Sequence, residues 1–482
     1  MFKTRHLDVT PTRPNIVLFL TDDHGAWANR CYGNAEIRTP HLDALASRGV
    51  RFDHAFTPTP VCSPARACLL TGRTASQVGI HDWLQESIPD IGQRDWLASE
   101  MGFTLPELLH GAGYHTGLSG KWHVGQSYDT PRGFDWCFGM PGAQGVHDGP
   151  YTYHLNGTPV TLTGNKTALI TDHAIEFLHA APSDKPFFLN VGYIATHSPY
   201  EDTAHDPAVV KTYWDATFTD VPAYTPHPRA KDEGVDPGKP TTPAERLSRL
   251  RGYYAGVTEI DHAVGRIVAS LRESNQLDNT IILYTSDHGC ALGHHGFWGK
   301  GNSTRPLNMY ETSLRVPLIW SGPGVAPGVE VNQCVDHFDT FQSVLGMTGI
   351  DTPTNRDYPG TSYAAALRGQ PLVDWSDTRF GEYGDLRMVR TPRHKLVWRY
   401  PNGPHDLFDL ETDPGETRSL STDPGQARLI EALKLQIDTF YARHEVAERS
   451  GLKVKNLPRH NEASEAWRDG LRERAQNETR PK

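Results

Sequence analysis

The chain has 482 residues, of which 37% are hydrophobic and 22% are charged. A chain of this length and composition can bury a substantial core, which excludes wholesale disorder. The formal net charge of −10 argues against nucleic acid as a partner, and no apolar run reaches the roughly 18 residues that a membrane-spanning helix needs.

The N-terminus and the cysteines bear on the cellular compartment. Residues 1–15 lack the charged, apolar and small-residue succession of a secretory signal, so we expect a cytoplasmic location unless a signal was removed before residue 1. The six cysteines form no CxxC pair and have neither disulfide-framework nor zinc-finger spacing. We expect most of them to be reduced and buried.

Short apolar runs predict buried strands that alternate with amphipathic helices. The first run covers residues 15–21 and is followed directly by Asp22 and Asp23. Capping-box spacings open a helix at Thr104 and a longer helix at Thr242. Further strands are predicted at 186–191, 280–285 and 316–320. This alternation predicts an α/β fold with a large, mostly parallel central sheet flanked by helices.

Two later regions differ from the rest of the chain in residue composition and hydrophobic pattern. Residues 198–240 are rich in Pro and Asp and too long for an ordinary connection, which is typical of a binding loop or lid. From about residue 374, short alternating segments precede a helical pattern at 426–441, which predicts a small antiparallel sheet with one helix. We therefore expect a large α/β domain at 1–373 and a C-terminal α+β subdomain with a polar tail at 374–482.

Acidic residues follow two of the predicted strands. Asp22 and Asp23 come after the first, and Asp287 and His288 follow the strand at 280–285. Ligands collect at the carboxyl ends of strands in an α/β sheet, so neighbouring strands would bring three carboxylates into one crevice. Like charges share a site only with a cation, and oxygen ligands favour Ca²⁺ or Mg²⁺. The alternative is that these residues only form turns.

A second candidate site lies in the segment Cys62-Ser-Pro-Ala-Arg66. Pro64 suits the first turn of a helix, which places Cys62 near a helix N-terminus, where backbone N–H groups attract an anion. Arg66, one turn further on, can reach the same point. A lone cysteine before a helix is more often structural, and we expect the nearby Cys68 to be a core residue.

Several motifs follow one another in a fixed order along the chain. Cys-x-Pro-x-Arg at 62–66 is followed by Leu-Leu-Thr-Gly-Arg at 69–73. The other landmarks are residues 15–23, 113–123, 195–200 and 285–296, with Lys300. Together these motifs resemble the type I sulfatases of the alkaline phosphatase superfamily. The resemblance covers about residues 13–345, extends more weakly through 406–416, and implies an alkaline-phosphatase-like sheet and a catalytic role for the large domain.

The resemblance implies an unusual nucleophile. In such enzymes a separate formylglycine-generating enzyme oxidises the motif cysteine, here Cys62, to Cα-formylglycine, an aldehyde that hydrates to a gem-diol. One hydroxyl attacks the sulfur of a sulfate ester and displaces the alcohol. The second hydroxyl then loses its proton, the carbonyl re-forms and sulfate leaves. A serine at position 62 could accept the sulfuryl group but would lack the hydroxyl that releases it.

The resemblance also implies a divalent metal, Ca²⁺ or alternatively Mg²⁺. Its ligands are expected to be Asp22, Asp23, Asp287, His288 and residue 62, originally Cys62. His288 stands where many relatives have Asn, and an imidazole ligand leaves the identity of the metal open.

The remaining catalytic roles are implied at the matching positions. Lys121 and Lys300 are expected to hold sulfate oxygens, and Arg66 to orient the diol. His123 is expected to take the proton from the second hydroxyl, and His197 to protonate the leaving alcohol, with Lys300 as the competing donor. Without the resemblance, the two histidines and Lys121 read as ordinary turn or loop residues.

Other residues near these motifs receive weaker assignments. Expected to be structural or outer-shell groups are His24, His294 and His295. Candidates for the substrate pocket are Trp298, Arg305 and Asn308. Loop aromatics that could stack on a sugar ring, or only pack, are Trp83, Trp96, Tyr151, Tyr153, Tyr200, Tyr213 and Trp214.

The predicted activity is hydrolysis of a sulfuric ester, with a sulfated mono- or oligosaccharide as substrate, because an intracellular enzyme meets imported fragments rather than polymers. Steroid, aryl and choline sulfates stay open as substrates. The rival activity is that of a formylglycine-dependent phosphodiesterase or phosphonate monoester hydrolase, since both kinds of substrate present tetrahedral, singly charged groups. A binding protein that kept the fold but lost the chemistry is disfavoured because every expected charged position is filled.

Overall fold

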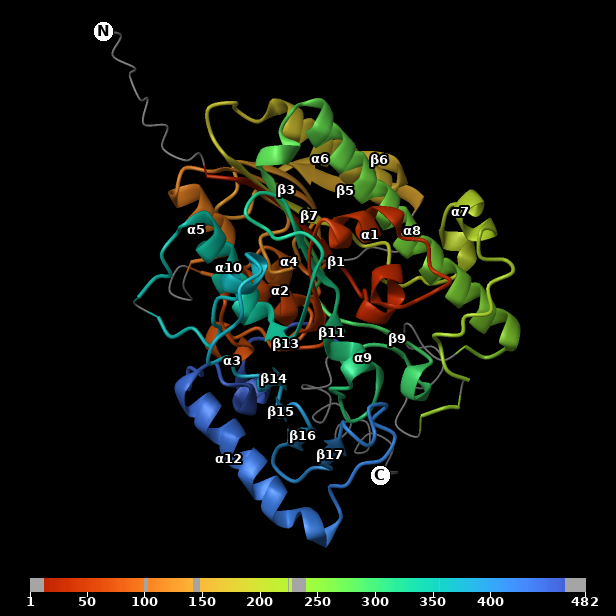
Figure 1. Cartoon of the computed structure of the whole chain (residues 1–482), viewed down its shortest axis with the longest axis vertical. Helices are drawn as coiled ribbons and strands as arrows, with labels where there is room; N and C mark the ends of the chain where they lie inside the picture. Colours follow the sequence, from red (N-terminus) through yellow and green to blue (C-terminus); the bar gives the residue numbers. More distant parts are fainter. Residues whose placement is uncertain are drawn as a thin grey trace, which may run out of the picture.

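A large mixed sheet forms the centre of the molecule (Figure 1). The structure is a computed structural model that describes residues 13–98, 103–141, 148–223, 225–227, 240–354 and 356–463. The sheet has eleven strands in the order β11-β2-β12-β8-β1-β7-β3-β4-β5-β6, and β13 pairs with β2. The strands are β1 (Asn15–Thr21), β2 (Gly49–Phe56), β3 (His115–Lys121), β4 (Trp136–Met140), β5 (Asp148–Leu155), β6 (Thr158–Asn165), β7 (Phe187–Gly192), β8 (Thr280–Ser286), β11 (Arg315–Val316), β12 (Leu318–Ser321) and β13 (Val329–Asp336).

The middle of this sheet is parallel, and most of its outer pairings are antiparallel. Strands β8, β1, β7, β3 and β4 pair in parallel. Strand β12 is antiparallel to β8, and β5 and β6 form an antiparallel hairpin beyond β4. The fold class predicted from the sequence is confirmed. Tyr151 and Tyr153, expected to be loop aromatics, instead lie in strand β5 of this hairpin.

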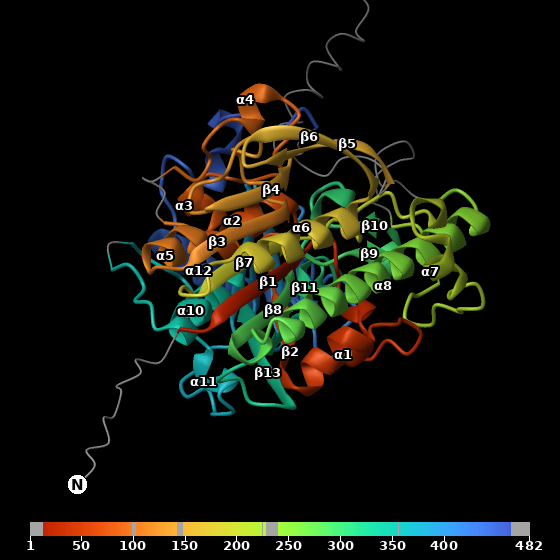
Figure 2. The same cartoon turned by 90° about the horizontal axis from the view of Figure 1, so that it is seen from above.

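Helices cover both faces of the sheet, as the view from above shows (Figure 2). In β1, Ile16, Leu18 and Leu20 pack into the core on one face, and Val17 and Phe19 pack into the core on the other, because successive side chains of a strand point to opposite faces. The helices on the first face are α2 (Cys62–Thr71), α5 (Leu105–Gly111), α10 (His337–Thr348) and α11 (Ala364–Leu367). Those on the second face are α1 (Pro40–Ser47), α6 (Lys166–Ala180) and α8 (Pro243–Glu273). This double covering explains why the central strands are apolar throughout.

The predicted helix starts are observed. Thr104 caps α5 with a complete capping box, and the Thr242 side chain accepts a hydrogen bond from the Glu245 N–H at the start of α8. None of the described helices combines the length and the apolar character of a membrane span. The remaining short helices of the α/β part are α3 (Ala75–Val78), α4 (Pro89–Gly92), α7 (Pro207–Lys211) and α9 (Glu311–Leu314).

A second, four-stranded antiparallel sheet follows in the sequence, with one long helix packed on it. Its strands are β14 (Arg379–Tyr383), β15 (Leu386–Arg390), β16 (His394–Arg399) and β17 (Asp406–Asp409), and the helix is α12 (Ala427–Arg443). Figure 1 shows this part in blue, below the main sheet. The small sheet and helix confirm the predicted architecture, whereas the domain boundary at residue 373 stays a prediction. The predicted polar tail from 464 onward lies outside the described residues.

The long segment predicted as a binding loop is partly packed. Its residues Tyr200, Val210, Tyr213, Phe218 and Val221 belong to a core cluster with α8. Burial of these side chains fixes much of the segment against the helix. Residues 224 and 228–239 lie outside the described part of the chain.

Candidate active site

The two acidic segments predicted to converge lie side by side at the carboxyl edge of the sheet. Strands β1 and β8 pair in parallel with Thr21 opposite Ser286, so the residues after each strand emerge together. The Asp23 N–H donates to Asp287 Oδ1 at 3.3 Å, and the Asp287 N–H donates to the Thr21 carbonyl at 3.0 Å. Asp22, Asp23 and Asp287 are all buried.

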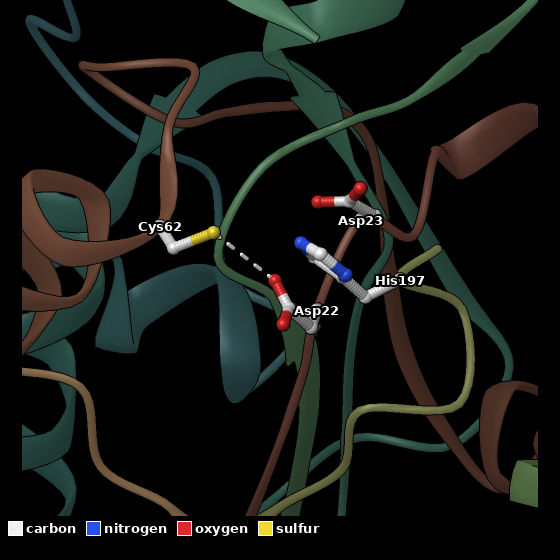
Figure 3. Close-up of side chains that lie close together, drawn as sticks. All are labelled: Asp22, Asp23, Cys62 and His197. Carbon is white, nitrogen blue, oxygen red and sulfur yellow. Dashed lines mark hydrogen bonds between the residues drawn. The ribbon is translucent and has the colours of Figure 1, made fainter. Parts of the chain in front are cut away.

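Cys62 faces these carboxylates from the first residue of α2 (Figure 3). Its Sγ lies 3.3 Å from Asp22 Oδ1, 3.4 Å from His288 Nε2 and 3.2 Å from Lys300 Nζ. Burial raises the pKa of the Cys62 thiol, but Lys121 and Lys300 outweigh this and lower it to about 6. Residue 62 is therefore placed where an anionic form is stabilised.

Each of the three carboxylates is paired with one permanent cation. Lys121 Nζ at the end of β3 lies 2.5 Å from Asp22 Oδ2, and Lys300 Nζ lies 2.5 Å from Asp23 Oδ1. Arg66 Nε, one turn into α2, lies 2.9 Å from Asp287 Oδ2. All six side chains are at least nine-tenths buried, so each carboxylate interacts strongly with the cation that is paired with it.

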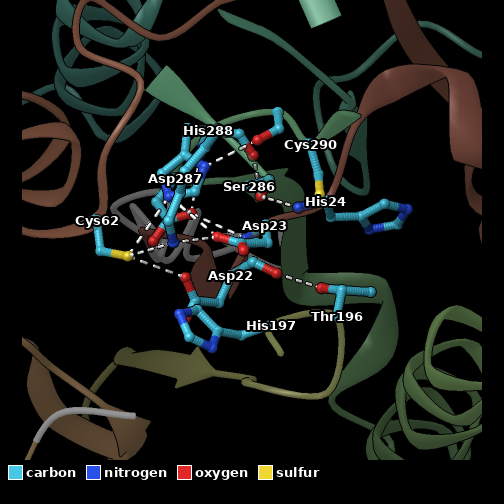
Figure 4. Close-up of polar contacts among 12 residues, drawn as sticks. Asp22, Asp23, His24, Cys62, Thr196, His197, Ser286, Asp287, His288 and Cys290 are labelled. Carbon is cyan, nitrogen blue, oxygen red and sulfur yellow. Dashed lines mark hydrogen bonds and ion pairs between the residues drawn. The ribbon is translucent and has the colours of Figure 1, made fainter. Parts of the chain in front are cut away.

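Two histidines complete the cluster around Cys62 (Figure 4). His288 Nε2 lies 3.2 Å from Asp23 Oδ1 and 3.5 Å from Asp287 Oδ1. Burial lowers the His288 pKa, but the neighbouring carboxylates raise it to about 9. His197, half-buried in the segment after β7, offers a ring nitrogen within 4.8 Å of ligand atoms of Asp22, Asp23 and Cys62.

His123 lies next to this cluster and is oriented by the backbone. Its Nε2 donates to the Leu84 carbonyl at 2.8 Å, which leaves Nδ1 as the nitrogen with a free lone pair. Within the described part of the chain, Nδ1 has no hydrogen-bond partner, although it is buried. Burial and then Lys121 lower the His123 pKa to about 3, so the ring is neutral.

The donor set fits a divalent cation beside a small oxyanion. Two overlapping groups, Asp22-Asp23-Cys62-His197 and Asp22-Cys62-Asp287-His288, each have their ligand atoms within 4.8 Å of one another. Carboxylate oxygens and one imidazole suit a hard or borderline divalent ion. Arg66 Nη2 is buried with no hydrogen-bond partner among the described residues, which suits it to bind an anion.

The sequence reasoning missed the residues that hold these ligands in place. Tyr253, from the middle of α8, donates to the Asp23 carbonyl at 2.7 Å. His337, the first residue of α10, donates from Nε2 to the Asp287 carbonyl at 3.1 Å, and the Thr196 hydroxyl donates to the Asp22 carbonyl. Tyr253 and His337 are only polar residues on largely apolar helices, which does not identify a partner, whereas Thr196 lies within the motif at 195–200.

Most aromatic residues proposed for sugar stacking are buried, so they pack rather than bind. Tyr200 is 2% exposed and donates to Asp23 Oδ2 at 3.1 Å, which makes it a support for the site. Trp214 is exposed and lies under Arg251. The other buried aromatics are Trp96, Tyr153 and Tyr213, and those half-buried are Trp83 and Tyr151.

Two of the three residues proposed for the substrate pocket are instead packed or hydrogen-bonded within the protein. Trp298 is buried in a core cluster, and Asn308 Nδ2 donates to the Lys300 carbonyl at 3.1 Å. Arg305 is half-buried. Of the histidines expected to be structural, His24 bonds to Tyr284 and Ala28, His294 lies against Trp27, and His295 stacks on Tyr310.

Comparison with known proteins gives matches over most of the chain. The profile of the Sulfatase family matches residues 14–350, and that of the N-sulphoglucosamine sulphohydrolase C-terminal family matches residues 293–443. N-acetylglucosamine-6-O-sulfatase of Bacteroides thetaiotaomicron is 28% identical over 84% of this chain and 82% of its own length. The ulvan-active sulfatase of Formosa agariphila is 30% identical over 86% of this chain and 78% of its own. A solved structure in complex with its substrate D-glucosamine-2-N,6-O-disulfate has a TM-score of 0.76 and 25% identity, over 90% of this chain and 98% of that one.

Proposed function

Because the chain belongs to the type I sulfatase family of the alkaline phosphatase superfamily and is a sulfatase, we propose that it hydrolyses the sulfate ester of a sulfated mono- or oligosaccharide. The observation that carries this proposal is the buried convergence of Asp22, Asp23, Asp287 and His288 on Cys62. The named activities of the two relatives and the ligand of the solved neighbour support a carbohydrate substrate.

In this proposal residue 62 is the nucleophile. A separate formylglycine-generating enzyme oxidises Cys62 to Cα-formylglycine, whose hydrated aldehyde carries two hydroxyls on one carbon. One of these hydroxyls, in its deprotonated form, attacks the ester sulfur through its oxygen, and the bond between sulfur and the alcohol oxygen breaks. The position of Cys62 at the start of α2 supports this role, because backbone N–H groups at a helix N-terminus favour a developing anion.

The metal would be held by Asp22, Asp23, Asp287, His288 and the modified residue 62, with Ca²⁺ favoured and Mg²⁺ as the alternative. When bound, it would supply Lewis-acid polarisation of the sulfate oxygens.

The permanent cations of the site would hold the sulfate group. Lys121 and Lys300 are buried beside Cys62, and Nη2 of Arg66 has no hydrogen-bond partner in the part of the chain that the structure describes. Preorganised charges of this kind stabilise the negative charge that grows on the sulfate oxygens as the ester bond breaks. The lysines act as point charges, whereas the planar Arg66 is suited to orient the attacking hydroxyl.

Two proton transfers complete the reaction. His197 gives a proton to the departing alcohol oxygen, with Lys300 as the competing donor. His123 Nδ1 takes the proton of the remaining hydroxyl, the carbonyl of residue 62 re-forms, and the bond from its carbon to the sulfated oxygen breaks to release sulfate. The lone pair of His123 Nδ1, which has no hydrogen-bond partner among the described residues, supports this assignment.

Two measurements test the proposal. Mass spectrometry of the peptide that contains Cys62, from cells able to make formylglycine, should show conversion; an unmodified thiol throughout would contradict the nucleophile. A panel of sulfated mono- and disaccharides, aryl sulfate, choline sulfate and an aryl phosphodiester is then assayed for released product. Fastest turnover of a sulfated saccharide is expected, and faster turnover of the phosphodiester would assign the rival activity.

A further inference from the structure

A short segment at residues 83–85 connects two parts of the candidate active site. The Leu84 N–H donates to Ser63 Oγ at 2.9 Å, and the Leu84 carbonyl accepts from His123 Nε2 at 2.8 Å. Ser63 follows Cys62 in the first turn of α2, and both are buried. One backbone unit therefore contacts both the helix that carries the nucleophile position and the imidazole proposed as the base.

The residues on either side of Leu84 are bound by the end of the described chain. We call residues 457–463 the C-terminal strap. Asn461 Nδ2 in the strap donates to the Trp83 carbonyl at 2.8 Å, and the His460 carbonyl accepts from the Gln85 N–H at 2.9 Å. The central residue, Leu84, thus bonds to the site, and its carbonyl also accepts the Glu86 N–H at 3.0 Å. Its two neighbours bond to the strap.

The strap is anchored deeply enough to act as a support. His460 and Asn461 are both 0% exposed. The His460 ring packs on Trp96 with ring centres 4.8 Å apart, and its Nε2 lies 3.1 Å from the His81 backbone nitrogen. The same Nε2 lies 3.2 Å from the Gly79 carbonyl, and burial lowers the pKa of His460 to about 3, so the ring is neutral. Two fully buried residues within an otherwise mostly exposed strap indicate specific docking rather than surface contact.

We infer that the C-terminal strap is a positioning element of the active site, acting through Leu84 on His123. By holding Trp83 and Gln85 it fixes the Leu84 carbonyl, and this carbonyl fixes the ring orientation and the tautomer of His123. The inference rests on the proposed role of His123 as the base. Displacement of a catalytic group by about 1 Å can cost on the order of 100-fold in rate, so a support this close to the base affects turnover directly.

The first test removes the donor of Asn461. In Asn461→Ala, and in the isosteric Asn461→Asp, kcat on an aryl sulfate should fall about 10-fold or more while KM changes less than about 2-fold. The control is Lys453→Ala, an exposed residue just before the strap whose side chain forms no hydrogen bond or ion pair within the described chain. It should keep wild-type kcat. Unfolding temperature and formylglycine content are measured for every variant.

A double-mutant cycle separates positioning from a general structural effect. If the strap acts through His123, Asn461→Ala should lose most of its effect on kcat in a His123→Ala background, because the misplaced group is already absent. Equal losses in both backgrounds, unchanged kcat in Asn461→Ala, or a loss explained by less formylglycine would overturn the inference.

An activity-independent measurement keeps failure of the strap distinct from failure of the proposed function. Amide hydrogen exchange at Leu84 and Gln85 should become faster in Asn461→Ala and stay unchanged in Lys453→Ala. If the wild-type protein releases no sulfate from any ester, the proposed function fails, whereas faster exchange at Leu84 still shows that the strap holds this segment. Unchanged exchange at Leu84 overturns the inference whatever the activity.

Discussion

Replacement of Lys121 by methionine tests the electrostatics of the site most directly. Its Nζ lies 2.5 Å from Asp22 Oδ2, and both side chains are 0% exposed. Lys121→Met leaves the Asp22 carboxylate buried without its main partner, which costs about 3–5 kcal/mol of unfolding free energy. Loss of a preorganised charge beside the sulfate should also lower kcat about 100- to 1,000-fold. Stability is measured by thermal unfolding, and kcat by release of sulfate from an aryl sulfate.

The matched control is Lys395→Met in the C-terminal sheet. Lys395 is equally buried and lies 3.1 Å from Glu311 Oε1, with Glu416 as a second partner, so its loss should destabilise the protein comparably. It should leave kcat of the folded enzyme near that of wild type. Added Ca²⁺ after chelation should stabilise both variants, because both keep the candidate metal site, but it should stabilise Lys121→Met more, because there the ion also replaces a lost cation beside Asp22. A kcat within about 3-fold of wild type in Lys121→Met, or equal restoration of both variants, would refute the reasoning.

Three further predictions concern the nucleophile, pH and substrate charge. Cys62→Ser should release about one alcohol per active site and then stop, with a sulfated serine visible by mass spectrometry in the peptide that contains position 62; steady turnover would contradict the second-hydroxyl mechanism. Burial raises the pKa of Asp261 to about 7, so the stability that this carboxyl contributes is complete below pH 4 and is lost as the pH rises through 7. Asp261→Asn should therefore be more stable than wild type at pH 8, by on the order of 4 kcal/mol, and should show no such gain at pH 4. Thermal unfolding at both pH values measures this difference. An aryl phosphate monoester, a dianion at pH 8, should turn over far more slowly than the matching aryl sulfate, and equal rates would contradict a site whose charges are balanced for a monoanion.

Local patterns predicted the parts of the fold that depend on neighbouring residues. The apolar runs of β1 and β8, the capping residues Thr104 and Thr242, and the acidic residues directly after the two strands all lie within a few positions of one another in the sequence. Their convergence followed from one general rule, that ligands collect at the carboxyl ends of strands in an α/β sheet.

The supporting contacts could not be predicted because they connect distant segments through unremarkable residues. Tyr253 reaches Asp23 across 230 positions, and Asn461 reaches Trp83 across 378. Neither residue belongs to a motif. Each bonds to a backbone carbonyl, which every residue has, so the type of the partner residue gives no indication of the contact. The antiparallel outer strands were missed for a similar reason, because strand order is set by packing and not by the pattern within each strand.

The charge balance of the site explains why the family chemistry suits a monoanionic ester. Three buried carboxylates, Asp22, Asp23 and Asp287, face three permanent cations, Arg66, Lys121 and Lys300, so these fixed charges cancel. A divalent cation added to this set gives an excess of two positive charges, provided that a ligating His288 is neutral. In the proposed mechanism, a deprotonated hydroxyl of the modified residue 62 and one sulfate monoester would neutralise that excess. A phosphate monoester dianion would instead leave one unpaired negative charge, which is costly in a buried site. A phosphodiester carries the same single charge as a sulfate ester, so the buried charges do not separate these two substrates, and selection between them depends on the groups attached to the ester.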